Sequence, residues 1–310
     1  SAMKIVDKIR NEGGKLLAFK SSTGGLIAPE YDNNPWNYKF TWNPRNVVLA
    51  GQGVSMYLEK GDVKYIPYHR LFERLEKIEI PGLGDFEIYP NRDSLKYREI
   101  YNLNDIPTIF RGTIRRPGYC KAWNIFVQLG LTDDTYTIEN SANMTYRQFI
   151  NMYLPYHNTK SVEEKIIEQF NLDINSDEMN KLKWLGIFEN DKIGLEKATP
   201  AQILQKKLEE KWVLGKDDKD LIVMQHQFEY SKNNKNYRII SSLNVIGQDT
   251  THTAMSLTVG LPVAIATKML LTGKIKLTGV HTPVIPELYN PILDELEQYG
   301  IVFTETETEI

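Results

Sequence analysis

The stretch 221–246, LIVMQHQFEYSKNNKNYRIISSLNVI, decides the fold that we expect of this chain. Apolar and β-branched residues dominate Leu221–Tyr230 and Tyr237–Ile246, and the polar segment 231–236 separates these two runs. Two such runs joined by a short Asn-rich segment predict a β-hairpin. The chain is therefore expected to contain a sheet to which its later half contributes two long strands.

Three earlier segments carry the same signal. Leu16–Phe19 is a short apolar run that leads into Ser21–Gly25, and residues 85–89 and 108–114 are each flanked by proline or glycine. The sheet is therefore expected to draw strands from both halves of the chain.

A block of helices separates these two sets of strands. Between residues 117 and 213, Ser161 with Glu164 and Thr199 with Gln202 have the spacing of capping boxes. Strands before and after such a block predict an α+β fold, with a mixed-sheet domain and an inserted helical domain. The expected boundaries are 4–116 plus 217–310 for the sheet domain and 117–216 for the helical domain. Residues 1–3 (Ser-Ala-Met) resemble the remnant of an expression tag.

Further helices are expected outside this block. The pattern predicts helices at 4–13 and from Asn43-Pro44, and Asn290-Pro291 is expected to open a last helix that ends at Gly300. Residues 254–271 form a helix that is apolar almost all round, so it should be buried in the core or against a second subunit of a homodimer. Because Ser, Thr, Gly, Pro and Lys interrupt it, we do not expect it to cross a membrane.

Composition limits the classes of function. The chain has 310 residues, a formal net charge of −3 and no basic stripe that would suit a nucleic acid. Cys120 is its one cysteine, so no disulfide forms within the chain and a reducing, cytoplasmic compartment is expected. The five histidines are scattered without a pair at metal-ligand spacing, and no metal site is predicted.

The glycine fingerprint of dinucleotide-binding domains is missing. Gly51-x-Gly53 has Met56 where a third glycine is needed, and Gly82-x-Gly84 runs into a strand instead of a helix. We therefore expect this chain alone to bind no NAD(P)H and to catalyse nothing. Cys120, in the first turn of an expected helix, has two interpretations: a stabilised thiolate nucleophile, or, more commonly, a small buried residue.

Arginine residues indicate a ligand. Strand alternation places Arg111, Thr113 and Arg115 on one face, and Gly112 would let a ligand approach the backbone; Arg92 follows the preceding strand. Guanidinium groups bind carboxylates at two points, so the row suits a carboxylate-rich ligand. The alternative is a row of surface ion pairs with Asp and Glu side chains.

Longer motifs make the sequence recognisable. They are 22–30 STGGLIAPE, 38–45 YKFTWNPR, 89–94 YPNRDS, 111–118 RGTIRRPG, 258–266 TVGLPVAIA and 271–275 LTGKI. In this order, from about Lys4 to Ile301, the sequence resembles the C-terminal domain of saccharopine dehydrogenase (glutamate-forming), also called saccharopine reductase.

The resemblance implies an enzyme of three parts. An N-terminal Rossmann domain for NADP(H) or NAD(H) would lie upstream of Lys4 and is absent from this chain. The mixed-sheet domain for substrate binding and dimerisation is related to the C-terminal domain of glyceraldehyde-3-phosphate dehydrogenase, and a helical domain is inserted in it. The lysine and aspartate proposed as acid–base groups belong to the upstream region, so no catalytic residue is assigned here.

The resemblance also implies roles for individual residues. The saccharopine-binding residues that it implies are Arg92, Arg111, Gly112 and Thr113, and the residues that face cofactor and substrate are Ser22, Thr23, Gly24 and Gly25. Thr23 stands where the family often has cysteine, and Ile27 where it often has proline. These departures affect the expected substrate preference and leave the expected architecture unchanged.

The implied activity is NAD(P)-dependent cleavage of saccharopine to glutamate and aminoadipate semialdehyde, or the reverse, in lysine metabolism. Saccharopine carries three carboxylates, which fits a site built from arginines. Two other functions stay open at this point. A carboxylated-polyamine dehydrogenase would need an acidic cluster beside the arginines, and a non-catalytic binding or dimerisation module could retain the fold without the reaction.

Overall fold

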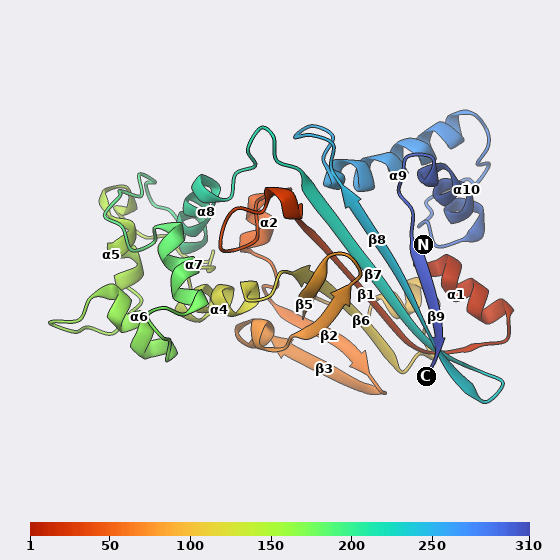
Figure 1. Cartoon of the computed structure of the whole chain (residues 1–310), viewed down its shortest axis with the longest axis horizontal. Coiled ribbons are helices and arrows are strands. Elements are labelled where there is room, and N and C mark those ends of the chain that lie inside the picture. Colours follow the sequence, from red (N-terminus) through yellow and green to blue (C-terminus); the bar gives the residue numbers. More distant parts are fainter.

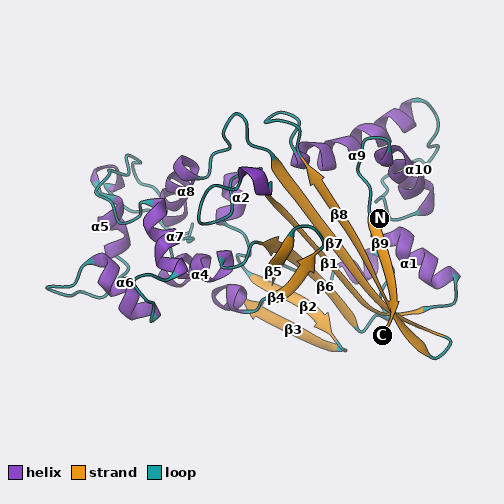
Figure 2. Cartoon of the chain, viewed as in Figure 1, coloured by secondary structure: helices purple, strands orange, loops and turns teal.

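The structure, a computed structural model, describes every residue from Ser1 to Ile310. A mixed β-sheet occupies the middle of the molecule, helices α4–α8 lie at one end, and α1, α9 and α10 lie at the other (Figures 1 and 2). The strands are β1 (Lys15–Ile27), β2 (Val54–Glu59), β3 (Asp62–Pro67), β4 (Glu76–Ile80), β5 (Gly84–Pro90), β6 (Thr108–Arg115), β7 (Asp220–Lys232), β8 (Lys235–Ile246) and β9 (Thr304–Glu309). The helices are α1 (Ala2–Asn11), α2 (Pro44–Val48), α3 (Tyr97–Ile100), α4 (Tyr119–Leu129), α5 (Tyr146–Asn151), α6 (Val162–Phe170), α7 (Asp177–Leu185), α8 (Pro200–Lys211), α9 (Ala254–Leu271) and α10 (Pro286–Glu297).

Strand β1 joins the two halves of the chain in one sheet. The order is β3-β2-β6-β1-β7-β8-β9, and the β4–β5 hairpin attaches through β5 to β6. β1 runs parallel to β6 and antiparallel to β7. The sheet is therefore mixed and carries helices at both ends, which confirms the expected α+β fold. The division into two domains stays a prediction, and the largest hydrophobic cluster extends from the helical block into the sheet.

The local signals for helix starts are confirmed. The side chain of Asn43 accepts a hydrogen bond from the backbone N–H of Asn46, which opens α2. Ser161 and Thr199 each form a complete capping box, at α6 and α8 respectively. These motifs involve residues only three positions apart, so the sequence itself contains all the partners.

Two boundaries and four strands differ from expectation. The β7–β8 hairpin turns on Asn233 and Asn234, both with positive φ, so the predicted turn at 231–236 is mostly strand. Helix α10 begins at Pro286, and Pro291 lies inside it instead of at its start. Strands β2, β3, β4 and β9 were not predicted.

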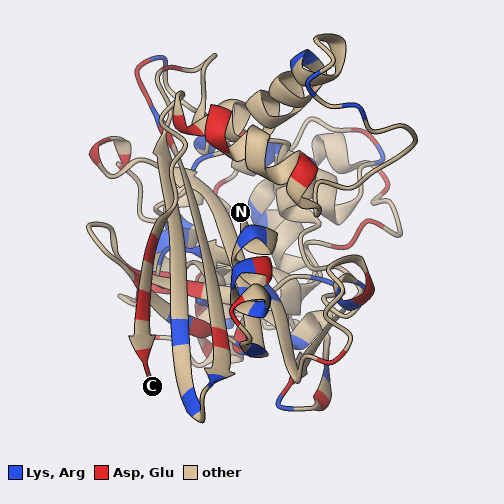
Figure 3. Ribbon diagram, turned by 90° about the vertical axis from the view of Figure 1, so that its right-hand side faces the viewer, with Lys and Arg blue, Asp and Glu red and all other residues tan.

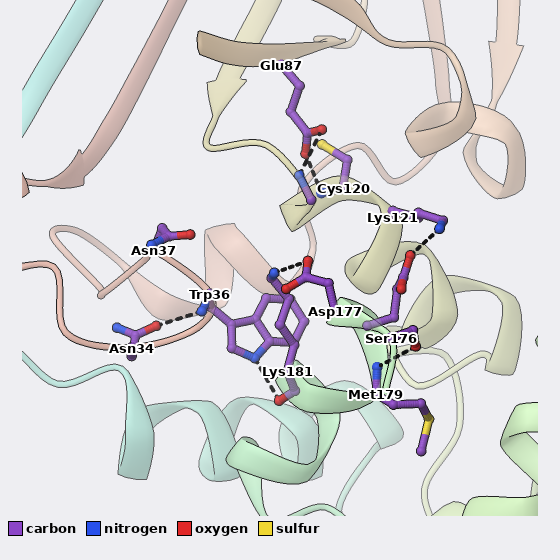
Figure 4. A network of polar contacts seen from close by, with 12 residues as sticks. Asn34, Trp36, Asn37, Glu87, Cys120, Lys121, Ser176, Asp177, Met179 and Lys181 are labelled. Atoms are coloured by element: carbon purple, nitrogen blue, oxygen red, sulfur yellow. Dashed lines mark hydrogen bonds and ion pairs between the residues drawn. The ribbon is translucent and has the colours of Figure 1, made fainter. Parts of the chain in front are cut away.

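The helical block is tied to the sheet by polar contacts at the start of α4 (Figure 4). Glu87 of β5 accepts hydrogen bonds from the backbone N–H groups of Cys120, at 2.6 Å, and Gly118, at 3.3 Å. These are N–H groups that the helix itself leaves without a partner. Trp36 donates its indole N–H to the backbone oxygen of Lys181 in α7, at 2.9 Å. Side chains from the first 90 residues thus fix two helices of the inserted block.

Helix α9 does not lie in the core of this chain, which corrects one of the two sequence-based expectations for it. Ala254, Ile265 and Met269 are buried, whereas Val263 is 65% and Leu271 84% exposed. Figure 3 views the molecule from the end that holds α1, α9 and α10, and few charged residues are seen on α9. The sheet covers only one side of the helix, so burial of the other side requires a partner. By length and composition α9 could also span a membrane, although packed helices of soluble proteins meet the same test.

Candidate functional site

A cavity of about 930 Å³ lies between one face of the sheet and helices α9 and α10. Most of its lining is apolar, and the apolar residues come mainly from α9, α10 and strands β7 and β8. Four of its polar residues gather near the paired strands β1 and β6, while Ser1, Thr258, Thr267 and His281 line other parts of the cavity. The residues of this polar end are Thr23, Gly24, Gly25, Trp42, Asn91, Thr113 and Arg115.

The parallel pairing of β1 and β6 builds the polar end. Thr23 lies opposite Thr113 in the register, and the side-chain amide of Asn91 donates to the Thr113 hydroxyl at 3.1 Å. Gly24 is required by packing, because a Cβ there would lie 2.6 Å from the backbone oxygen of Ile114. The strands therefore bring two hydroxyls and an amide to one side of the cavity.

Arg115 is the most unusual residue of the polar end. It is 3% exposed, yet it forms no ion pair, and its Nε has no hydrogen-bond partner. Three tyrosine rings surround its guanidinium carbon: Tyr38 at 5.0 Å, Tyr119 at 5.2 Å and Tyr89 at 5.8 Å from the ring centroids. Cation–π contacts offset part of the cost of burying the charge. Glu87 lies opposite Arg115 in the β5–β6 register, but its carboxylate accepts the N–H groups of Gly118 and Cys120 and forms no ion pair with the guanidinium. A buried guanidinium without a counterion, at the edge of a cavity, is suited to an anionic ligand.

Arg115 is charged, whereas the three phenols around it are neutral. Burial would lower the pKa of the guanidinium, yet its pKa lies above the ordinary value, so Arg115 keeps its charge at physiological pH. Burial raises the pKa of each of the three phenols, which therefore stay neutral at physiological pH. The guanidinium is thus a permanent cation whose direct neighbours are three neutral phenol rings.

The structure brings together only some of the residues that the sequence singles out. Of that set, Thr23, Gly24, Gly25 and Thr113 line the cavity, while Ser22, Arg92, Arg111 and Gly112 do not. The Arg111 guanidinium stacks on the ring of Tyr97, at 4.1 Å. The roles of Arg92 and Arg111 in saccharopine binding stay predictions that rest on the resemblance.

The importance of Arg115 could be predicted only in part from the sequence. Strand alternation placed it with Arg111 and Thr113 in a row that suits a carboxylate-rich ligand, but the resemblance implied no role for it. Its three tyrosines lie on β5, on α4 and in the segment before α2, and no local pattern shows that these segments converge.

Cys120 does not fit the nucleophile interpretation. The side chain is buried, and burial, with the nearby Glu87 carboxylate, raises the pKa of its thiol well above the ordinary value. A thiol that stays protonated is a poor nucleophile. No group of three or more His, Cys, Asp and Glu side chains is placed to hold a metal ion.

His226 forms a second buried polar group on the same face of the sheet. Its two ring nitrogens lie 3.0 Å from the hydroxyls of Ser1 and Ser21. Burial, together with the nearby amino terminus, lowers the pKa of His226 to about 3, so the imidazole is neutral. It adds no charge near the cavity.

A mixed sheet with a helical block between its strands, and a cavity with one buried cation at its polar end, defines an α+β domain with a cavity large enough for a small molecule. The sequence matches the family model described as "Saccharopine dehydrogenase C-terminal domain" over residues 1–301. The chain belongs to this family, which confirms the resemblance seen in its motifs.

Relatives agree in sequence and structure. The chain is 32% identical to saccharopine dehydrogenase [NADP(+), L-glutamate-forming] of Saccharomyces cerevisiae, covering 98% of this chain and 70% of that protein. It is 35% identical to the mitochondrial alpha-aminoadipic semialdehyde synthase of Rattus norvegicus, but spans only 34% of that protein. The solved structure of apo saccharopine dehydrogenase (L-Glu forming) from S. cerevisiae superposes with a TM-score of 0.88 at 31% identity, over 99% of this chain and 70% of the other. The chain therefore belongs to an oxidoreductase family of lysine metabolism.

Proposed function

We propose that this chain is the substrate-binding part of an NAD(P)-dependent saccharopine dehydrogenase, and that Arg115 holds one carboxylate of the substrate. The buried guanidinium at the polar end of the cavity carries this proposal, because it donates to the backbone oxygen of Ile114 but has no ion-pair partner. A bound carboxylate would supply the counterion that the folded chain lacks. The charge-assisted hydrogen bonds between this carboxylate and the guanidinium would be strong, because the site is buried.

The remaining lining fits the rest of such a ligand. Thr23, Thr113 and Asn91 offer hydroxyl and amide groups to polar atoms of the substrate. The apolar side chains of α9 and α10 would keep water from the reacting carbon. In this proposal the chain binds and orients the substrate, and it supplies no acid–base group.

The lining does not fit the phosphates of a nicotinamide nucleotide. A pyrophosphate needs several cations or free backbone N–H groups at a helix start. Arg115 is the only Lys or Arg residue in the lining, and the N–H groups of Ala254 and Met255 at the start of α9 already bond to Asp220. We propose that the cofactor, which is NADP in the name of the yeast relative, is held by protein outside this chain. The chain alone would then be inactive, and no step of the reaction is assigned to the cofactor here.

The carboxylated-polyamine alternative lacks its expected feature. A polyamine tail carries several positive charges, and the lining contains neither Asp nor Glu. Arg115 would repel such a tail at the polar end. The arrangement therefore favours an amino-acid adduct with several carboxylates over a polyamine.

The expected homodimer and cytoplasmic location remain part of the proposal. Helix α9 leaves Val259, Val263, Leu270 and Leu271 more than half exposed, and the first three also line the open side of the cavity. An exposed apolar stripe of this kind marks an interaction surface. We propose that this side of α9 is covered in the assembled enzyme. The lone Cys120 is compatible with a reducing compartment.

Titration of saccharopine into this chain, followed by calorimetry, tests the proposed function. We expect a saturable heat with saccharopine, weaker binding of glutamate or lysine alone, and no binding of spermidine. Each half of saccharopine keeps only part of its carboxylates, so its affinity should be lower. Binding of spermidine in preference to saccharopine would overturn the proposal.

A further inference from the structure

The first turn of α9 sets the width of the cavity beside its polar end. Met255 and Thr258 of this turn line the cavity. Gly25 of β1 lies directly against it, since a Cβ on Gly25 would be 2.9 Å from Cε of Met255. A shift of the turn would therefore change the space available to a ligand next to Gly25.

A buried carboxylate fixes that turn. Asp220, the first residue of β7, is 1% exposed. Its Oδ1 accepts the backbone N–H of Ala254 at 2.6 Å, and its Oδ2 accepts that of Met255 at 2.9 Å. These N–H groups have no partner within the helix. Thr253, the N-cap residue, satisfies a different one, the N–H of Ser256.

The carboxylate of Asp220 has no cationic side chain as a partner. Burial raises its pKa, and the hydrogen bonds from Met255 and Ala254 oppose that rise. Two charge-assisted hydrogen bonds and the positive end of the α9 helix dipole compensate the negative charge of this carboxylate. Gly247 leaves room for it, because a Cβ there would lie 2.2 Å from Oδ1. The sheet and the loop before α9 are thus shaped around this one carboxylate.

We propose that Asp220 is a positioning residue, which holds the first turn of α9 against β1 and β7 and so sets the shape of the ligand cavity. The proposal deepens the proposed function and rests on it for the identity of the ligand. It predicts a local effect, because Asp220 touches α9 only at the turn that borders the polar end.

Replacing Asp220 with asparagine tests the proposal. Asn keeps one acceptor, but its NH₂ group faces the second N–H and cannot bond to it. Hydrogen exchange of the amides at 254–258 should become about 10- to 100-fold faster, while the β7–β8 amides exchange as before. Under conditions where the variant is fully folded, saccharopine should bind about 10- to 100-fold more weakly.

Asp249→Asn is the matched control. Asp249 lies in the same loop and accepts backbone N–H groups of Thr251 and His252, but it does not touch α9. This variant should change neither the exchange at 254–258 nor the affinity. Gly247→Ala is a second variant that displaces the Asp220 carboxylate without removing it, and it should reproduce the effects of Asp220→Asn.

Three results would contradict the proposal: unchanged exchange at 254–258, equally faster exchange throughout the sheet, or unchanged affinity despite a loosened turn. Unchanged affinity despite a loosened turn would mean that Asp220 stabilises the fold without shaping the ligand cavity. Absence of saccharopine binding in the unsubstituted chain would instead overturn the proposed function. The exchange pattern would still decide whether Asp220 holds α9.

Discussion

Replacement of Arg115 with methionine is expected to weaken saccharopine binding by about 2–5 kcal/mol, roughly 30- to several-thousand-fold. The variant leaves a substrate carboxylate in a buried place without its partner. Arg115→Lys should recover only part of the loss, because an ammonium group cannot reproduce the two-point contact of a guanidinium. Calorimetric titration of the variants measures both effects.

The same substitution should not destabilise the ligand-free chain. Met removes a buried charge that has no counterion and leaves a flexible apolar side chain among three tyrosine rings. We therefore expect the free energy of unfolding in urea to be equal to or higher than that of the unsubstituted protein. Loss of affinity together with retained stability is typical of a functional residue.

Parallel variants separate Arg115 from the other arginines. Arg70, an exposed residue paired with Glu73, serves as the control, and Arg70→Met should bind saccharopine normally. Arg111→Met and Arg92→Met test the roles that the resemblance implies for these two arginines. A loss of saccharopine affinity as large as that of Arg115→Met would support those roles. Normal affinity of Arg115→Met would contradict our assignment.

Trp36→Ala is expected to cost about 4–5 kcal/mol of the free energy of unfolding, at the upper end for a buried tryptophan. Trp36 is fully buried, and its ring lies 5.3 Å from that of Trp212 and 5.7 Å from that of Tyr119. The substitution leaves a large cavity and also removes the donor to the Lys181 oxygen. Urea unfolding followed by circular dichroism gives the value.

Two further variants control this result. Trp36→Phe keeps a ring and loses the hydrogen bond, so about 1–2 kcal/mol is expected. Trp184→Ala removes a half-buried tryptophan on α7 and should cost less than half as much as Trp36→Ala. A cost below about 1 kcal/mol for Trp36→Ala would show that this aromatic cluster does not join the helical block to the sheet.

The features that sequence reasoning predicted correctly are those with local causes. The capping boxes at Ser161 and Thr199 and the β7–β8 hairpin depend on residues close in the chain. One local signal was missed. Lys60 and Gly61 both have positive φ between β2 and β3, which is typical of a two-residue hairpin turn.

The features that could not be predicted depend on distant partners. Strand β9, with alternating Thr and Glu, has no apolar face and forms only because β8 offers it an edge. The composition of α9 predicted burial, but whether a helix is covered depends on what packs against it. Alternation placed Arg111 and Arg115 on one face, and only the tertiary structure puts Tyr97 over one and a cavity beside the other.

A crystal structure of saccharopine bound to a protein that contains this chain tests the central claim most directly. We expect a substrate carboxylate within about 3 Å of the guanidinium nitrogens of Arg115, in hydrogen-bonding geometry. The secondary amine should lie near Thr23 and Thr113. Saccharopine bound with all its carboxylates away from Arg115 would contradict the account.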